Sequence, residues 1–168
     1  MVGCPDATAE NPTVARGWQC ALTVPRELSI RDGKLCQRPA HEIERMRGDC
    51  VRAIGGETVE EPGRLFDLVV SCEGAKMVEL EIRKGVFVRY ADGMLTLDMG
   101  DEGYGRDQRS IELSELRDLR VLSDTTMVEI FANGGEAALT SRTYSPAVPA
   151  MELHAEGAAS MNFYRLAH

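Results

Sequence analysis

The chain has 168 residues, 43% of them hydrophobic, and carries 27 acidic against 19 basic residues, for a net charge of -8. A chain of this size can bury about 70% of the surface that its unfolded form exposes, so we expect one self-sufficient domain. The excess of negative charge repels phosphate backbones and anionic lipid, which argues against nucleic acid or a membrane as partner. The sequence shows neither a secretion signal nor an apolar stretch that could span a bilayer.

Cysteine and histidine spacing gives no sign of a metal site. Five cysteines, an odd number, are scattered without a C-x-x-C pair, and the three histidines are isolated from them. Structural zinc sites usually show paired ligands in the sequence, so we expect no metal and no other cofactor. We interpret the cysteines as reduced thiols, which predicts a cytoplasmic protein.

The N-terminal residues differ in composition from the rest of the chain. Prolines and small polar residues crowd the stretch before Gly17-Trp18. Such a stretch cannot build a core of its own and is typical of a connector. We therefore expect a linker over residues 1–18 and one folded domain over residues 19–168.

Glycine-containing turns recur between short apolar runs throughout residues 19–168. Asp32-Gly33 and Asp92-Gly93 are the strongest hairpin signals, because aspartate tolerates positive φ and glycine adopts it without strain. The flanking runs are rich in β-branched and aromatic residues and alternate with polar ones at period two. Three weaker turn signals are Glu73-Gly74, Gly134-Gly135 and Glu156-Gly157.

Helical signals are weak by comparison. The best candidates, residues 39–48 and 111–118, are each expected to form a turn or two at most. Short strands with glycine turns and little helix predict an all-β fold. We expect two antiparallel sheets packed face to face, a β-sandwich of the jelly-roll or concanavalin-like type. The polar residues 99–109 are expected to form a surface loop between strands.

One acidic residue lies on the apolar face of a predicted hairpin. With Gly134-Gly135 at the turn, Glu129 lies opposite Thr140 and diagonal to Arg142 on the same face. A planar arginine partner makes a buried glutamate tolerable. We therefore predict a structural Glu129–Arg142 ion pair in preference to a catalytic acid.

A second carboxylate does not complete a catalytic pair. In one extended strand, the α-carbons of Asp124 and Glu129 would be ~17 Å apart, whereas paired catalytic carboxylates lie ~5 to 9.5 Å apart. Asp124 is better interpreted as a turn residue whose side chain accepts a nearby backbone N–H. The sequence also lacks a nucleophile-and-base motif. No catalytic residue is therefore assigned.

Two motifs at opposite ends of the chain resemble the C-terminal β-sandwich of glycoside hydrolase family 32, which includes invertases, sucrose-6-phosphate hydrolases, levanases and inulinases. The first is ALTVPRELSIRDGKLCQRPAHEIERMRG, residues 21–48, and the second lies within residues 124–144. The residues matching the first family phrase are Leu22, Thr23, Pro25, Arg26, Glu27, Leu28, Gly33, Leu35, Gln37 and Pro39. Those matching the second are Asp124, Val128, Glu129, Phe131, Asn133, Gly135, Glu136, Thr140, Ser141, Arg142 and Tyr144.

The resemblance implies a non-catalytic role for this chain. In the family, a five-bladed β-propeller precedes the sandwich and carries the catalytic carboxylates in motifs like W-M-N-D-P-N-G, R-D-P and E-C. By the same resemblance, the linker expected over residues 1–18 includes a remnant of the last edge of that propeller. These motifs do not occur here: Asp32 stands in RDG, and Glu73 follows a cysteine as CE. The implied role is to stabilise a propeller in the same polypeptide, with homodimer contacts as a further option. The parent enzyme would hydrolyse β-fructofuranosidic bonds, and this chain alone would be inactive.

A carbohydrate-binding module that holds fructan or sucrose is the alternative function. Sandwich lectins present exposed aromatic rings that stack on sugars, and this chain has few aromatic residues to spare from its core. The candidates for sugar stacking are Trp18, Tyr90 and Tyr104.

Overall fold

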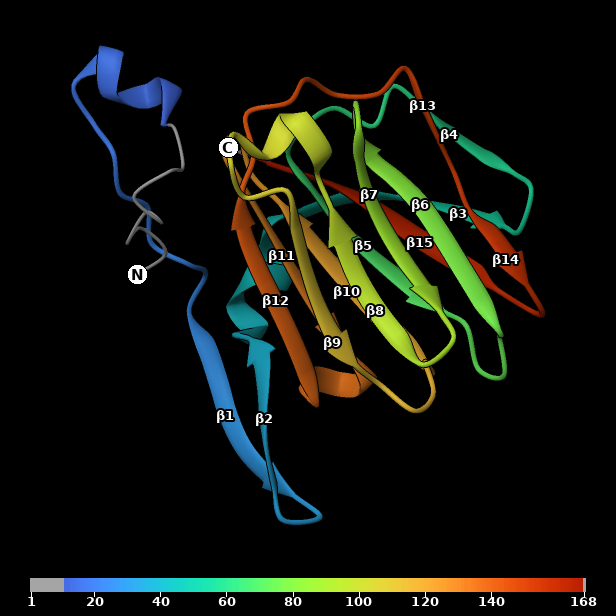
Figure 1. Ribbon diagram of the computed structural model, residues 1–168. Helices are drawn as coiled ribbons and strands as arrows, with labels where there is room; N and C mark the ends of the chain where they lie inside the picture. The colour runs from blue at the N-terminus through green and yellow to red at the C-terminus, as the bar shows by residue number, and fades with distance from the viewer. Residues whose placement is uncertain (1–10, 168) are drawn as a thin grey trace.

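The computed structural model describes residues 11–167, which form two antiparallel β-sheets packed face to face (Figure 1). The β-sandwich expected from the sequence is confirmed. The six-stranded sheet contains, in spatial order, β12 (Ala137–Arg142), β11 (Met127–Ala132), β10 (Asp118–Ser123), β5 (Phe66–Ser71), β15 (Ser160–Leu166) and β3 (Arg47–Ile54). The five-stranded sheet contains β14 (His154–Glu156), β6 (Met77–Arg83), β7 (Val86–Ala91), β8 (Met94–Asp98) and β9 (Gln108–Glu112).

Two small sheets and four short helices complete the described residues. β1 (Arg26–Arg31) pairs with β2 (Lys34–Pro39), and β4 (Thr58–Glu60) pairs with β13 (Ala150–Glu152). None of the helices within residues 11–167 is long and apolar enough to cross a membrane. All four are 3-10 helices: η1 (Pro12–Arg16), η2 (His41–Met46), η3 (Gly100–Gly103) and η4 (Asn133–Gly135).

The core lies between the two large sheets and follows the period-two alternation of their strands. In β5, Phe66, Leu68 and Val70 are fully buried in the core, and Asp67 and Val69 between them face the other side of the sheet. The rings of Phe66 and Phe163 pack with centroids 5.3 Å apart. The six-stranded sheet therefore has an outer face of its own, and the N-terminal segment lies against it.

A buried cation ties the two sheets together at one end. Arg83, at the end of β6, is 0% exposed and donates from Nε to Ser123 Oγ of β10 over 3.0 Å. It also donates to the Ser145 carbonyl over 3.0 Å. Burial lowers the pKa of Arg83 to about 10. This role of Arg83 could not be predicted from the sequence, because its hydrogen-bond partners lie 40 and 62 positions along the chain.

The turn predictions are confirmed in part. Asp32-Gly33 joins β1 to β2, Asp92-Gly93 joins β7 to β8, and Gly134-Gly135 joins β11 to β12 in the expected register. Glu73-Gly74 and Glu156-Gly157 do form turns, but each carries the chain from one large sheet to the other, so the hairpins expected there are wrong. A local turn signal does not specify which strand the next segment will pair with.

One of the two helix predictions is confirmed and the other is wrong. Residues 39–48 contain η2, as expected, whereas residues 111–118 contain no helix. There the chain leaves β9, buries Leu113 and Leu116 in the core, and enters β10. Packing of these two leucines between the sheets outweighs the local helical pattern. The predicted loop over residues 99–109 is confirmed for residues 99–107, which connect β8 to β9 and contain η3, whereas residues 108 and 109 belong to β9.

Candidate functional site: the anchored N-terminal segment

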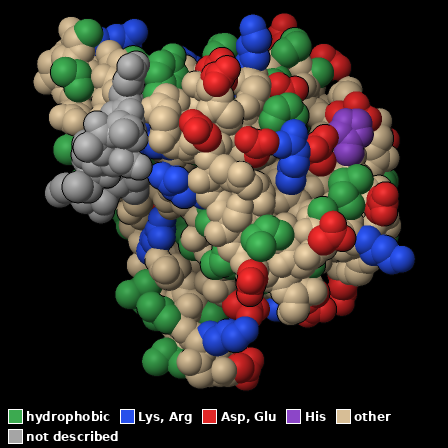
Figure 2. Space-filling model, in the orientation of Figure 1, with side chains coloured by type: hydrophobic (Ala, Val, Ile, Leu, Met, Phe, Trp, Pro, Cys, Tyr) green, Lys and Arg blue, Asp and Glu red, His purple; other side chains and the backbone are tan. Residues whose placement is uncertain are grey.

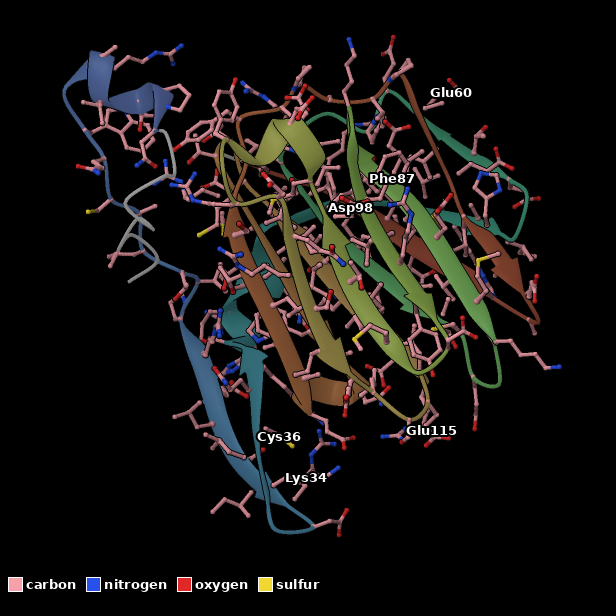
Figure 3. All side chains as sticks on the ribbon, viewed as in Figure 1. Lys34, Cys36, Glu60, Phe87, Asp98 and Glu115 are labelled. Atoms are coloured by element: carbon pink, nitrogen blue, oxygen red, sulfur yellow. The ribbon has the colours of Figure 1, made fainter. Side chains whose placement is uncertain are left out.

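The β1–β2 hairpin projects from the sandwich, with β2 as the strand nearer to it (Figure 1). Lys34 and Cys36 of β2 lie on the side that faces the sandwich (Figure 3), where Lys34 pairs with Glu136 and Cys36 is buried. At the same contact, Arg38 Nε donates to the Gly134 carbonyl over 2.6 Å. The turn between β11 and β12 is therefore the surface on which the hairpin rests.

Close backbone contact explains the glycine at position 135. A Cβ atom there would lie 2.0 Å from the Gln37 carbonyl oxygen, and the residue has a φ of +91°. Only glycine combines this approach with positive φ. Gly135 thus fixes how closely the hairpin packs on the sandwich.

Glu129 is the polar centre of this contact. Its side chain is 2% exposed, and its Oε2 accepts a hydrogen bond of 2.5 Å from Arg26 Nη2 at the start of β1. Its Oε1 accepts from the backbone N–H of Val24 over 2.7 Å. Arg26 Nη2 also reaches Thr140 Oγ1 over 2.8 Å, on the residue that pairs with Glu129 in the predicted register. The structure therefore corrects the predicted ion pair, because Arg26, and not Arg142, is the cation at Glu129.

Arg142 instead holds the segment that precedes the hairpin. It is 2% exposed, its Nη1 donates to the Gln19 carbonyl over 2.8 Å, and its Nε donates to the Thr126 carbonyl over 3.0 Å. The guanidinium lies 5.2 Å from the ring centroids of both Trp18 and Tyr144. Arginine between two aromatic faces is a favourable cation–π arrangement. Residues 18 and 19 are thus fixed to the edge strand β12.

A third contact fixes the beginning of the described segment. Asn11 Oδ1 accepts from Arg106 Nη2 over 2.7 Å and from the Tyr144 hydroxyl over 3.1 Å. Residues 11–18, the described part of the expected linker, contain η1. They are attached to the sandwich at both ends, through Asn11 and through Trp18.

The three sugar-stacking candidates lie in two different environments. Trp18, 41% exposed, and Tyr104 belong to one aromatic cluster, because the Tyr104 ring packs edge-on against Tyr144 with centroids 5.4 Å apart. Tyr90 is 5% exposed and its hydroxyl donates to the Leu113 carbonyl over 3.2 Å. Tyr90 is a core residue and cannot stack on a sugar. Its alternation with Val86 and Val88, both buried, was the sequence signal for this placement.

The opposite face of the hairpin is apolar and uncovered. Leu28, Ile30 and Leu35 are 65%, 77% and 58% exposed. Ile30 pairs with Leu35 across the hairpin, so all three share one face by alternation. Figure 2 shows hydrophobic side chains gathered on this projection. A two-stranded hairpin is marginally stable in water, so an apolar face of this kind is suited to contact with another surface.

Asp124 and His41, both exposed, have structural partners at the protein surface. Asp124 Oδ1 accepts the N–H of Thr125 over 2.6 Å, which confirms its role in a turn. His41 Nδ1 lies 2.9 Å from Glu27 Oε1, and its Nε2 lies 3.4 Å from Glu42 Oε1. Three exposed ligand groups thus cluster at His41, but both ring nitrogens already face carboxylates.

The comparisons with known proteins agree on one family. Residues 84–166 match the model described as glycosyl hydrolases family 32 C terminal. The chain is 38% identical over 154 residues to raffinose invertase of Escherichia coli, covering 81% of this chain and 32% of that protein. It is 32% identical over 145 residues to sucrose-6-phosphate hydrolase of Salmonella typhimurium, covering 81% of this chain and 28% of that protein. The chain thus spans about a third of the length of the curated relatives it matches.

Solved structures with lower sequence identity share the fold. The structure of sucrose-6-phosphate hydrolase from Lactobacillus gasseri has a TM-score of 0.80 at 21% identity, over 98% of this chain and 37% of that one. A β-fructofuranosidase from Bombyx mori has a TM-score of 0.71 at 20% identity, over 90% of this chain and 34% of that one. With the sequence matches, these findings show that the chain belongs to the C-terminal β-sandwich domains of glycosyl hydrolase family 32.

Proposed function

We propose that this chain is the non-catalytic C-terminal module of a β-fructosidase of the sucrose-6-phosphate hydrolase and invertase type. Its role is to pack against a catalytic propeller domain of the same polypeptide and to stabilise that domain. The observation that carries the proposal is the apolar face of Leu28, Ile30 and Leu35, which is uncovered although Lys34 and Arg38 hold the opposite face of the hairpin on the sandwich.

The anchoring contacts support docking to a partner domain. A flexible arm would lose conformational freedom when it bound, and this loss would weaken the contact. Arg26, Arg142 and Gly135 fix the segment on the sandwich before any partner is present. In the matched relatives, about two thirds of the length lies outside the region that this chain covers, which leaves room for a further domain.

The parent reaction and its location are part of the same proposal. The names of the matched relatives favour hydrolysis of a β-fructofuranosidic bond by the parent protein. The described cysteines, Cys20, Cys36, Cys50 and Cys72, are free thiols, which supports a cytoplasmic setting.

Co-elution with the catalytic domain tests the docking surface. The chain is co-expressed with the catalytic domain that precedes it in its parent protein, and the two are separated by size-exclusion chromatography. We expect a one-to-one complex that is lost in the Leu28→Asp/Ile30→Asp variant. Ile54→Asp, at a residue of β3 that is 56% exposed, serves as the matched control and should keep the complex. No complex with the wild-type chain would overturn the proposal.

A carbohydrate-binding role is the second candidate. It is favoured by the exposed ring of Trp18, which faces the Arg142 guanidinium together with Tyr144, and by Tyr104, which packs against Tyr144. Loss of levan, inulin or sucrose binding in Trp18→Ala or Tyr104→Ala would support this site.

A further inference from the structure

A groove of about 560 Å³ runs between the hairpin–η2 segment and the outer face of the six-stranded sheet. Its wall includes Glu27, Arg38 and His41, and its floor includes Arg120, Asn162 and Tyr164. This volume lies within the roughly 300–1,000 Å³ that is usual for small-molecule sites. Glu27 and Arg38 lie on the hairpin face opposite Leu28 and Ile30, so docking of a domain on the apolar face leaves the groove open.

A fully buried carboxylate fixes two arginines at the groove. Asp67 of β5 is 0% exposed and points to the outer face of the sheet. Its Oδ2 accepts from Arg47 Nε over 2.7 Å and from Arg120 Nη2 over 2.8 Å, and its Oδ1 accepts from Arg120 Nε over 2.9 Å. The guanidinium groups are therefore ordered before a ligand arrives, which reduces the entropic cost of binding.

A flat surface and an uncommitted amide lie beside these arginines. The Arg47 guanidinium stacks 4.4 Å from the centroid of the Tyr164 ring. Two residues earlier on the same face of β15, the side chain of Asn162 is half-buried in the groove floor and makes no hydrogen bond to the described residues. An asparagine amide offers two donors and one acceptor oxygen, a set that suits the hydroxyl groups of a sugar.

The charges of the groove favour a neutral ligand. Three arginines and His41 face four carboxylates, those of Glu27, Glu44, Asp67 and Asp118. Most of these groups are already paired, as Arg120 Nη1 is with Glu44 Oε1 at 3.3 Å. A phosphate group would find no uncompensated cluster of cations here, and the net charge of -8 opposes anions in general.

We propose that this groove binds a neutral oligosaccharide, with Asn162 and the edge of the Arg47–Tyr164 stack as the contacting groups. The sugar class rests on the proposed role in a β-fructosidase. The site differs from the Trp18 and Tyr104 cluster, which lies at β12 and the η3 loop and does not line the groove. A sugar held here would keep a polymeric substrate near the parent enzyme without blocking the hairpin.

Nuclear magnetic resonance titration of the chain tests the proposal, with sucrose and an inulin-derived oligosaccharide as probes. We expect amide shifts in β15 and η2 at millimolar sugar. In Asn162→Ala, the dissociation constant should rise about fivefold, which corresponds to one or two lost hydrogen bonds. Ser160→Ala, which removes a hydroxyl on the same face of β15 outside the groove, should leave the constant unchanged.

Three results would overturn the proposal that this groove binds a sugar. They are an absence of shifts in β15, binding that is insensitive to Asn162→Ala, and binding that is lost instead in Trp18→Ala. Tighter binding of sucrose 6-phosphate than of sucrose would contradict the neutral ligand class. Each of these results leaves co-elution with the catalytic domain unaffected, so a failure of this proposal is distinct from a failure of the docking proposal.

Discussion

Arg26 and Glu129 are 103 positions apart in the sequence, and Arg26 Nη2 donates to Glu129 Oε2 over 2.5 Å. This pair joins the start of the N-terminal hairpin to β11. The Glu129 side chain is buried in this contact, with 2% of its surface exposed. The backbone N–H of Val24 occupies the other carboxylate oxygen. The pair therefore fixes where the hairpin begins on the sandwich, and its strength can be measured.

Replacement of Arg26 should destabilise the chain strongly. In Arg26→Ala, Glu129 would keep its burial and lose its cation, which costs about 3–5 kcal/mol of unfolding free energy. Urea unfolding followed by circular dichroism measures the loss. Arg45→Ala, at an exposed arginine of η2, is the control and should stay within about 0.5 kcal/mol of wild type. Equal small losses in both variants would mean that the pair does not hold the hairpin.

Replacement of Arg142 should release the segment before the hairpin. Arg142→Met keeps most of the side-chain volume but removes the donor to the Gln19 carbonyl. Loss of about 1.4 kcal/mol in local stability would speed trypsin cleavage after Arg16, an exposed site, by about tenfold. Mass spectrometry of the digest gives the rate. Arg109→Met, at an exposed residue of β9, should not change it, and a wild-type rate in Arg142→Met would contradict the anchor.

Two glycines with positive φ should respond differently to alanine. At Gly135, the new Cβ would clash with the Gln37 carbonyl, so Gly135→Ala should cost more than about 3 kcal/mol. At Gly33, with a φ of +75°, nothing lies within 4 Å, so Gly33→Ala should cost only the left-handed strain of about 1–2 kcal/mol. Thermal unfolding of both variants checks the order. A larger loss at Gly33 would contradict the close packing of the hairpin.

The exposed pair of His41 and Glu27 should make a small contribution to stability in a defined pH window. The hydrogen bond that the His41 ring donates to Glu27, followed by the charge of Glu42, raises the pKa of His41 above its ordinary value. The same contact with His41 lowers the pKa of Glu27. The contribution of His41 to stability is fully present below the ordinary histidine pKa and is lost as pH rises through the raised pKa. The contribution of Glu27 to stability is fully present above the ordinary glutamate pKa and is lost as pH falls through the lowered pKa.

Titration of the His41 ring by nuclear magnetic resonance checks this pair. In Glu27→Gln, the pKa of His41 should fall towards its ordinary value, and in Glu42→Gln it should fall less, following the order of the two causes. An unchanged pKa in Glu27→Gln would mean that the two side chains do not meet in solution.

The local features of the fold could be predicted from the sequence. Gly134-Gly135 sets the register of β11 and β12, so the pairing of Glu129 with Thr140 followed from the turn alone. The cation that pairs with Glu129 could not be predicted in this way, because cross-strand rules consider only neighbours within the same hairpin. Arg26 comes from another element, and only the fold brings it there.

The candidate site could also be predicted only in part. The family motifs marked both the hairpin and β11–β12 as characteristic stretches, and the structure shows that these two stretches contact each other. The groove could not be predicted, because Asp67, Arg120 and Asn162 come from three strands whose order in the sheet is not encoded locally. Asp67 itself was an available signal, since a carboxylate within the apolar run FDLVV requires a partner.

Sucrose turnover by this chain, alone and with the catalytic domain proposed as its partner, tests the central claim most directly. We predict no turnover by the chain alone, because it carries none of the family's catalytic motifs. Added to the catalytic domain, the chain should lengthen the half-life of activity on heating and leave KM for sucrose unchanged. The Leu28→Asp/Ile30→Asp variant should give no protection. Turnover by the isolated chain, or equal protection by the variant, would contradict a non-catalytic module that docks through its hairpin.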